Sequence, residues 1–146
     1  MSFRPARLRR LVPLGLLSLA AGCQQSSSPA PPGARAPADA AADRGAALYA
    51  QNCVPCHRDN GEGLPKVFPS LSGSPAVVGD PIELAAWVLS QKRPASIPAG
   101  RYPTQMLLFG WMSDADAAAL LTYIRSHFGN SAPPVDAAMI AKSREK

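Results

Sequence analysis

Aromatic residues, cysteines and histidines are scarce in this sequence, and the patterns that predict β-structure are missing. Of its 146 residues only 6% are aromatic, three are cysteine and two are histidine. No stretch alternates apolar and polar residues over the length of a strand, and no segment repeats at a fixed period. These absences leave an all-α domain with few side chains that could hold a metal ion.

The sequence also lacks an apolar run long enough for a membrane-spanning helix. Residues 1–22 begin with four arginines, Arg4, Arg7, Arg9 and Arg10, and continue with the apolar stretch LVPLGLLSLA. That stretch is too short to span a membrane alone, and a basic start followed by a short apolar segment is typical of a secretory signal. We therefore expect the protein to act outside the cytoplasm.

Cys23 follows this signal in the stretch SLAAGC, which resembles the lipobox of bacterial lipoproteins. The resemblance implies that Cys23 carries a lipid and anchors a periplasmic protein to a membrane. Cleavage by an ordinary signal peptidase after Ala20 or Gly22 is the alternative, and it would leave a soluble periplasmic protein. Residues 24–38 consist largely of Ser, Pro, Ala and Gly and predict a disordered tether.

An excess of positive charge is absent once the signal is set aside. The chain has 15 Lys and Arg against 10 Asp and Glu, but four of the arginines lie in residues 1–22. The rest is nearly neutral, which argues against nucleic acid as a partner, because phosphate binding depends on clustered positive charge.

Proline is abundant, and 16 prolines are too many for one compact helical unit. Helical patterns occupy a domain at residues 39–130, with loops at 58–79 and 93–112. Asp80 before Pro81, and Ser113 before Asp116, predict two helix starts. A C-terminal extension follows at 131–146, and its last residues, KSREK, are expected to be solvated. A core this small usually needs a disulfide, a metal or a cofactor.

The stretch Cys53-Val54-Pro55-Cys56-His57 carries the chemistry, and it permits three interpretations. A redox dithiol needs a strand before the motif, and none is indicated. A structural zinc site needs four ligands, and only His127 could complete the set. Cys-x-x-Cys-His is also the signature of c-type haem attachment, in which two thiols bind the porphyrin and the histidine binds the iron. Export of the protein favours the haem.

The chain resembles the class I cytochromes c over residues 39–130. Gly45 and Tyr49 match a helix at the start of that family, and Leu120 and Tyr123 match its last helix. The resemblance implies an all-α fold of a few helices wrapped around one covalently bound haem c, with the N- and C-terminal helices crossing at these residues. Glycine permits the close approach because it has no Cβ.

The same resemblance assigns the residues around the haem. Cys53 and Cys56 would attach it, and His57 would ligate its iron. The Pro69 carbonyl of FPSL would accept the free ring N–H of His57, and Leu71 would line the pocket.

The sixth ligand of the iron is expected from the stretch TQMLLFGWM. By resemblance Met106 is that ligand, with Thr104 near a haem propionate. Leu107 stands where the family usually has proline. Met112 precedes the Ser113 helix start, where an apolar residue more often packs as a staple. His127 lies at the end of the last predicted helix and is a weaker alternative.

The stretches PAVVGDPIELAAWVLSQ and YIRSHFGNSAPPV narrow the resemblance to the haem domains that accompany membrane-associated periplasmic alcohol and sugar-acid dehydrogenases. It implies an electron-transfer protein and not an enzyme. Its redox partners would be a dehydrogenase or other donor and an oxidase or other cytochrome as acceptor. The extension is expected to pack back on the domain. The alternative function is a haem enzyme, or a protein that responds to gas or peroxide through a labile sixth ligand.

Overall fold

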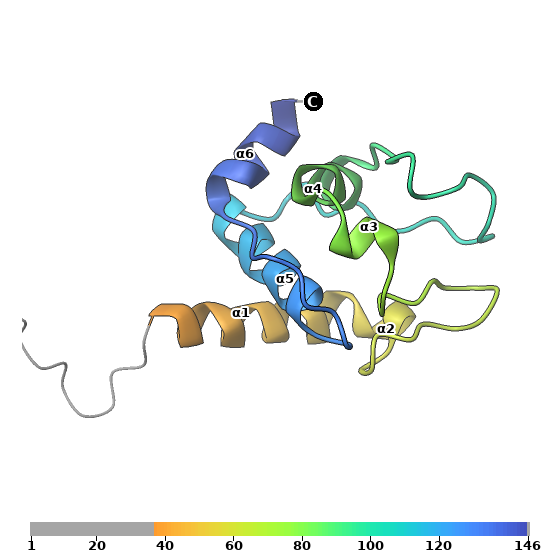
Figure 1. Cartoon of the computed structure of the whole chain (residues 1–146), viewed down its shortest axis with the longest axis horizontal. Helices are drawn as coiled ribbons and strands as arrows, with labels where there is room; N and C mark the ends of the chain where they lie inside the picture. Colours follow the sequence, from red (N-terminus) through yellow and green to blue (C-terminus); the bar gives the residue numbers. More distant parts are fainter. Residues whose placement is uncertain (1–36, 146) are drawn as a thin grey trace, which may run out of the picture. The chain divides into compact units, whose positions relative to one another are not determined.

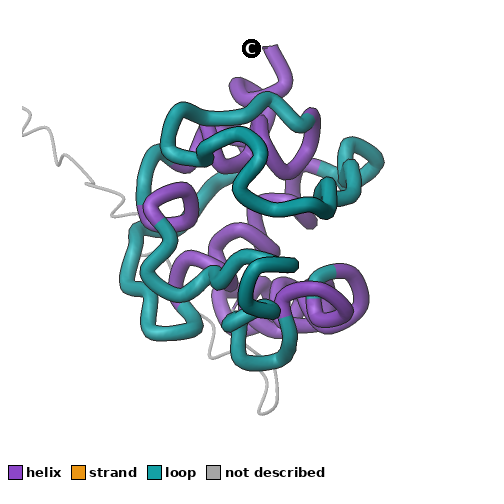
Figure 2. Tube along the Cα trace, turned by 90° about the vertical axis from the view of Figure 1, so that its right-hand side faces the viewer, coloured by secondary structure: helices purple, strands orange, loops and turns teal. Residues whose placement is uncertain are grey.

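Six helices and the loops between them make up the described part of the chain. The structure is a computed structural model that describes residues 37–145. Its helices, in chain order, are α1 (Pro37–Asn52), α2 (Val54–His57), α3 (Pro75–Val78), α4 (Pro81–Ser90), α5 (Asp114–Ser126) and α6 (Ala137–Glu145) (Figure 1). Within residues 37–145 Figure 2 shows helices and loops and no strand, and the β-type pairing there is limited to an isolated bridge between Leu64 and Phe68. The expected all-α fold is confirmed.

The membrane-related predictions fall elsewhere in the chain. The predicted signal, Cys23 and nearly all of the predicted tether lie outside the described residues. Among residues 37–145, no helix has both the length and the apolar character that a membrane span requires. The lipid anchor therefore stays a prediction.

Helices α1 and α5 cross (Figure 1), and Gly45 lies at their contact, as expected. A Cβ at Gly45 would lie 2.8 Å from Tyr123 Cβ and would collide with the Ala119 carbonyl oxygen. Tyr49 continues the contact, with its ring centroid 5.5 Å from that of Tyr123. Glycine is required here by the space between the two helices.

Helices α4 and α5 begin where the sequence predicts. Asp80 caps α4, and its carboxylate accepts the N–H groups of Ile82 and Glu83. Ser113 caps α5 in the same way through the N–H of Asp116. These caps satisfy backbone donors that a helix start leaves without partners.

Helix α6 packs against α4 and α5, so the C-terminal extension does fold back on the domain. Ile140 and Ser143 on α6 are fully buried. The expected solvated end is exposed at Arg144 but is wrong for Ser143, which is buried. Arg144 also forms an ion pair with Asp114 (2.8 Å) and donates to the Met112 carbonyl oxygen (2.6 Å), because α6 brings its guanidinium to the start of α5.

Arg125 on α5 is 2% exposed and binds three carbonyl groups. Its guanidinium donates to Val77 O (2.6 Å), Gly79 O (2.9 Å) and Pro133 O (2.9 Å). Burial lowers the pKa of Arg125, but its hydrogen bonds compensate for the lost water. This side chain joins the end of α3 to the segment that precedes α6.

Candidate functional site

The Cys-x-x-Cys-His motif forms a tight turn at the end of α1. Cys53 N–H continues the α1 ladder to Tyr49 O (2.8 Å), and His57 N–H returns to Cys53 O (2.8 Å). Pro55 near the start of α2 has no N–H to lose, which suits the first turn of a helix. The turn brings Cys53 and His57 into the core, each 9% exposed, and leaves Cys56 half-buried.

His57 makes the contact that the resemblance implied for it. Its Nδ1 lies 3.0 Å from the Pro69 carbonyl oxygen, which can only accept, so Nδ1 carries the proton of the neutral ring. Nε2 is then the nitrogen that is available to a metal. Burial lowers the pKa of His57, with an opposing contribution from the Pro69 hydrogen bond. The ring is therefore held neutral and in one tautomer.

The Cys53 thiol does not have the property expected of the reactive thiol of a redox dithiol. Both cysteines are free, and burial raises the pKa of the Cys53 thiol to about 12. A dithiol exchange centre instead needs a thiol whose pKa is lowered.

The loop after His57 is bound firmly to the helices on both sides of it. Tyr49 on α1 donates its hydroxyl to Arg58 O (2.7 Å). Asn130, which follows α5 and is 7% exposed, donates to Leu71 O (3.1 Å) and accepts from Gly73 N–H (2.8 Å). Leu71 is half-buried and packs against the core. The segment that holds Pro69 is thereby fixed relative to His57.

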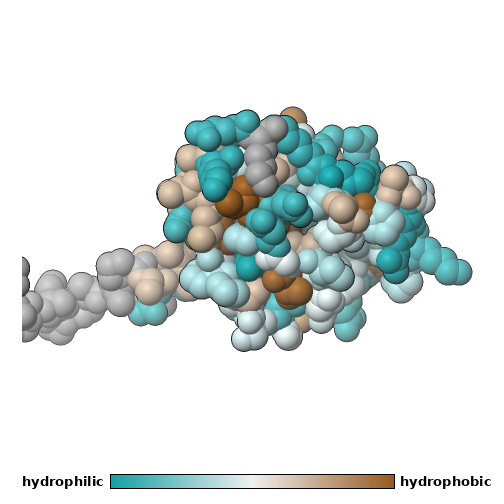
Figure 3. All heavy atoms as spheres, turned by 45° about the horizontal axis from the view of Figure 1, so that its top comes forward, coloured by the Kyte–Doolittle hydropathy of each residue, from teal (hydrophilic) through white to brown (hydrophobic). Residues whose placement is uncertain are grey.

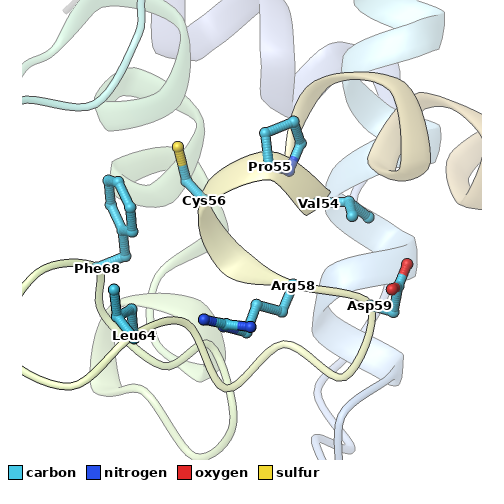
Figure 4. Close-up of a pocket in the computed structure, with 7 residues that line it drawn as sticks. All are labelled: Val54, Pro55, Cys56, Arg58, Asp59, Leu64 and Phe68. Carbon is cyan, nitrogen blue, oxygen red and sulfur yellow. The ribbon is translucent and has the colours of Figure 1, made fainter.

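A surface hollow of about 340 Å³ borders the motif at Cys56. Figure 4 shows Cys56, Phe68 and Leu64 on one side of α2, with Val54 and Asp59 on the other. The hollow includes neither His57 nor Met106 among its lining residues. It therefore marks the solvent-facing rim of the site at the second cysteine, beside the apolar Phe68 and Leu64.

Met106 and Met112 lie in different environments. Met106 is half-buried at the edge of the core, whereas Met112 is 2% exposed and forms part of it. Thr104 is exposed. Met112 therefore has the packed, staple-like position that the sequence suggested.

Leu107, Leu108 and Trp111 place apolar side chains at the surface beside Met106, with exposed fractions of 68%, 55% and 67%. Elsewhere, on the face drawn in Figure 3, apolar residues form separate patches among polar ones. Three neighbouring exposed apolar side chains in one loop suit a surface that meets another molecule.

His127 is exposed, and its ring stacks on Tyr123 with centroids 3.8 Å apart. Its Nδ1 lies 2.9 Å from Tyr123 O. No group of three or more His, Cys, Asp or Glu within residues 37–145 is arranged to hold a metal ion. The zinc interpretation thus finds no ligand set in this part of the chain.

The residues present fit a haem. Two free thiols stand in the Cys-x-x-Cys-His order of haem attachment, and a buried neutral imidazole next to them has Nε2 available. Several apolar side chains pack against the core while staying partly exposed, among them Val54, Leu71, Trp87 and Met106. No sequence pattern indicated Gln91, which donates to Met106 O, or Arg144, which donates to Gly110 O and Met112 O.

Comparison with known families agrees with this chemistry. The profile of the family described as Cytochrome c matches residues 42–128, which is more than half of the 146-residue chain. The match spans the motif and the Met106 loop.

Similar curated proteins include cytochrome subunits and a small cytochrome. The chain is 35% identical over 105 residues to the "Alcohol dehydrogenase (quinone), cytochrome c subunit" of Gluconobacter oxydans (strain 621H), covering 68% of this chain and 22% of that protein. It is 30% identical over 91 residues to the "Gluconate 2-dehydrogenase cytochrome c subunit" of Pantoea cypripedii, covering 60% and 21%. It is 29% identical over 92 residues to "Cytochrome c-552" of Thermus thermophilus, covering 60% and 70%. The chain thus spans about a fifth of the dehydrogenase subunits it matches.

Proposed function

The chain belongs to the cytochrome c family, and from this premise we propose that it is a single-electron carrier with a haem iron ligated by His57 and Met106. The family implies a covalently bound haem c. When bound, the haem supplies an iron that takes up and releases one electron. The observation that carries the proposal is the buried, neutral His57 with Nδ1 on Pro69 O and Nε2 available, directly after the two thiols.

The histidine side of the site holds the cofactor. Cys53 and Cys56 supply the sulfurs of the two thioethers, and the turn of α2 places His57 beside them. The hydrogen bond to Pro69 O fixes the ring plane and raises the basicity of Nε2. Leu71 lines the pocket wall in this proposal, because it packs against the core from the same loop.

On the methionine side, Met106 would occupy the sixth coordination position of the iron. Met106 is half-buried at the edge of the core, while Met112 is enclosed in it. A thioether from Met106 would fill the sixth position in both oxidation states, so electron transfer would require little rearrangement of bonds. Such a closed site favours a carrier over a haem enzyme. Thr104, in the same loop, is assigned to a haem propionate by the family resemblance.

The partner is proposed to approach at the rim of the site. Cys56, Phe68 and Leu64 border the surface hollow, so the attached edge of the haem would lie close to solvent. Contacts of electron carriers are small and short-lived because the carrier must leave quickly. The relatives named as dehydrogenase subunits support a dehydrogenase as donor, with a respiratory oxidase or another cytochrome as acceptor.

Matched methionine variants of the full-length, haem-loaded protein test this function. Met106→Leu and Met112→Leu both keep volume and remove sulfur. We expect the oxidised wild-type protein to show the weak red-edge sulfur-to-iron charge-transfer band. Met106→Leu should abolish the band, lower the reduction potential and let the reduced protein bind carbon monoxide, whereas Met112→Leu should keep the band.

Two results would contradict the proposal. If the band depends on Met112, the ligand assignment is wrong. If the reduced wild-type protein binds carbon monoxide quickly and turns over peroxide, the protein is a haem enzyme or a sensor and not a carrier.

The proposal places this carrier in the periplasm, on a membrane. Residues 1–22 would be removed and Cys23 lipidated, with residues 24–38 as a tether to the domain at 39–130 and its extension at 131–146. Cys23→Ser should move the red protein from the membrane fraction to the soluble periplasmic fraction. An unmutated protein that is already soluble, with a free Cys23 thiol, would contradict the anchor and leave the electron-transfer proposal intact.

A further inference from the structure

Gln91 lies where α4 ends, and its side chain reaches the loop that carries Met106. Its backbone is left-handed (φ 55°, ψ 25°), and its N–H donates to Trp87 O at 2.9 Å. Both polar atoms of its side-chain amide form hydrogen bonds. Nε2 donates to the Met106 carbonyl oxygen at 2.7 Å, and Oε1 accepts from Gln105 Nε2 at 2.7 Å. One side chain therefore ties two consecutive loop residues to the end of a helix.

The same helix end holds the loop on the other side of Met106. Phe109 N–H donates to Val88 O at 3.3 Å. Gly110 approaches the helix so closely that a Cβ there would lie 2.9 Å from Leu89 O. The end of α4 thus binds the loop both at Met106 and three to four residues after it.

Leu107 and Leu108 lie between these two attachments and are 68% and 55% exposed. Because these two side chains are exposed, packing restrains the main chain only weakly at the residues directly after Met106. The position of the Met106 sulfur depends on the position of the main chain that carries it, so the hydrogen bonds to that main chain matter. We propose that Gln91 is a positioning residue that holds Met106 against the iron, an inference that rests on the proposed ligation by Met106.

A positioning residue of this kind shifts the equilibrium between two states of the loop. In the closed state Met106 fills the sixth position, and in the open state the loop has moved away. A hydrogen bond that exists only in the closed state favours that state by about fivefold. An external ligand binds only the open state, so its apparent dissociation constant varies inversely with the open population. Loss of the bond from Gln91 therefore makes an external ligand bind about fivefold more tightly.

Imidazole titration of the oxidised, haem-loaded, full-length protein measures this balance. Loss of the sulfur-to-iron band reports displacement of Met106. The test variants are Gln91→Ala, which removes both bonds, and Gln91→Glu, whose carboxylate keeps the acceptor but cannot donate to Met106 O. The matched control is Gln51→Ala, at an exposed glutamine on α1. We expect the apparent dissociation constant for imidazole to fall about fivefold in both Gln91 variants and to stay unchanged in Gln51→Ala.

Far-UV circular dichroism under the same conditions separates positioning from unfolding, because the helical signal should be equal in all four proteins. The proposal is overturned if both Gln91 variants bind imidazole as the wild type does. It is also overturned if the control shows the same change. Met106→Leu distinguishes this failure from failure of the proposed function: a band that survives in Met106→Leu shows that another residue is the ligand. If the band is lost in Met106→Leu and the Gln91 variants are unchanged, only the role of Gln91 is wrong.

Discussion

The loop after His57 is bound to the helices along most of its length, whereas the loop that carries Met106 is bound mainly near its end. In the first, Arg58, Gly61, Leu71 and Gly73 each take part in a hydrogen bond to another part of the fold or across the loop. In the second, residues 93–104 bond chiefly within the loop, as Ile97 N–H does to Pro94 O (3.0 Å). The attachments to α4 begin only at residues 105 and 106.

Because the two loops differ in how firmly they are attached, the two halves of the proposed site should differ in mobility. In the proposed site the histidine side would stay fixed, because covalent bonds to Cys53 and Cys56 would leave the cofactor no alternative position. The methionine side is held by a few replaceable bonds, so it is the side where local opening should occur first.

Removal of both thiols should have the most severe effect, because it affects the whole domain and not one loop. In Cys53→Ala plus Cys56→Ala the haem has no covalent bond, and we expect little folded protein, because a small helical core relies on the apolar contacts of the haem. Haem staining after denaturing electrophoresis and far-UV circular dichroism measure the loss. Met106→Leu is the control, since it should retain both the stain and the helical signal. Haem that stays with the double variant under denaturing conditions would refute covalent attachment through these cysteines.

Asn130→Ala should affect stability more than ligation. Its amide binds Leu71 O, Gly73 N–H and Ile124 O, and truncation removes this shared partner from one buried and two partly buried groups. We expect a loss of about 2–3 kcal/mol in the free energy of unfolding, measured by urea denaturation of the haem-loaded protein. Asn60→Ala, at an exposed asparagine, is the control and should change little.

The imidazole constant of folded Asn130→Ala should equal that of the wild type, because the Met106 loop is attached elsewhere. If that constant instead falls as we expect for Gln91→Ala, the two loops are not held independently.

Asp116→Asn should change the stability of the domain only slightly and should affect neither loop more than the other. The hydrogen bond from Arg44, and to a lesser degree its charge, lower the pKa of Asp116 below the usual 3.8. A lowered pKa in the folded state stabilises the fold above the unfolded value near pH 4, and this stabilisation is lost as the pH falls through the folded pKa. The difference in Tm between wild type and variant should therefore be small at pH 7 and vanish well below pH 4. A difference that grows with acid would contradict the assignment, and the imidazole constant should not change.

The features that the sequence predicted correctly are local or are set by one residue type. Asp80 and Ser113 signal helix starts because a cap and its partners lie within three residues of each other. Gly45 signals the crossing because only a missing Cβ permits it. The sequence alone does not reveal the buried face of α1: Leu48 is buried there, whereas Ala42 and Ala50 are exposed.

The residues that hold the two loops could not be predicted, because their partners are remote in sequence. Gln91 reaches a residue 15 positions away, Asn130 reaches residues 57 and 59 positions away, and Arg144 reaches residues 30 to 34 positions away. A lone amide or guanidinium has no periodic pattern that indicates such partners. Only the fold decides whether it meets solvent or a carbonyl group.

Helix α1 has a further consequence for how the domain can be mounted. Residues 38–44 are exposed, and burial begins at Gly45, so the first two turns project beyond the crossing with α5 (Figure 1). Cys53 follows the opposite end of this helix of 16 residues, roughly 24 Å along the axis. A pull on the chain at Pro37 is therefore applied at the end of α1 that lies away from the Cys53–His57 motif. The domain should therefore tolerate fusion to a different leader or partner protein ahead of α1 without a change in its redox chemistry.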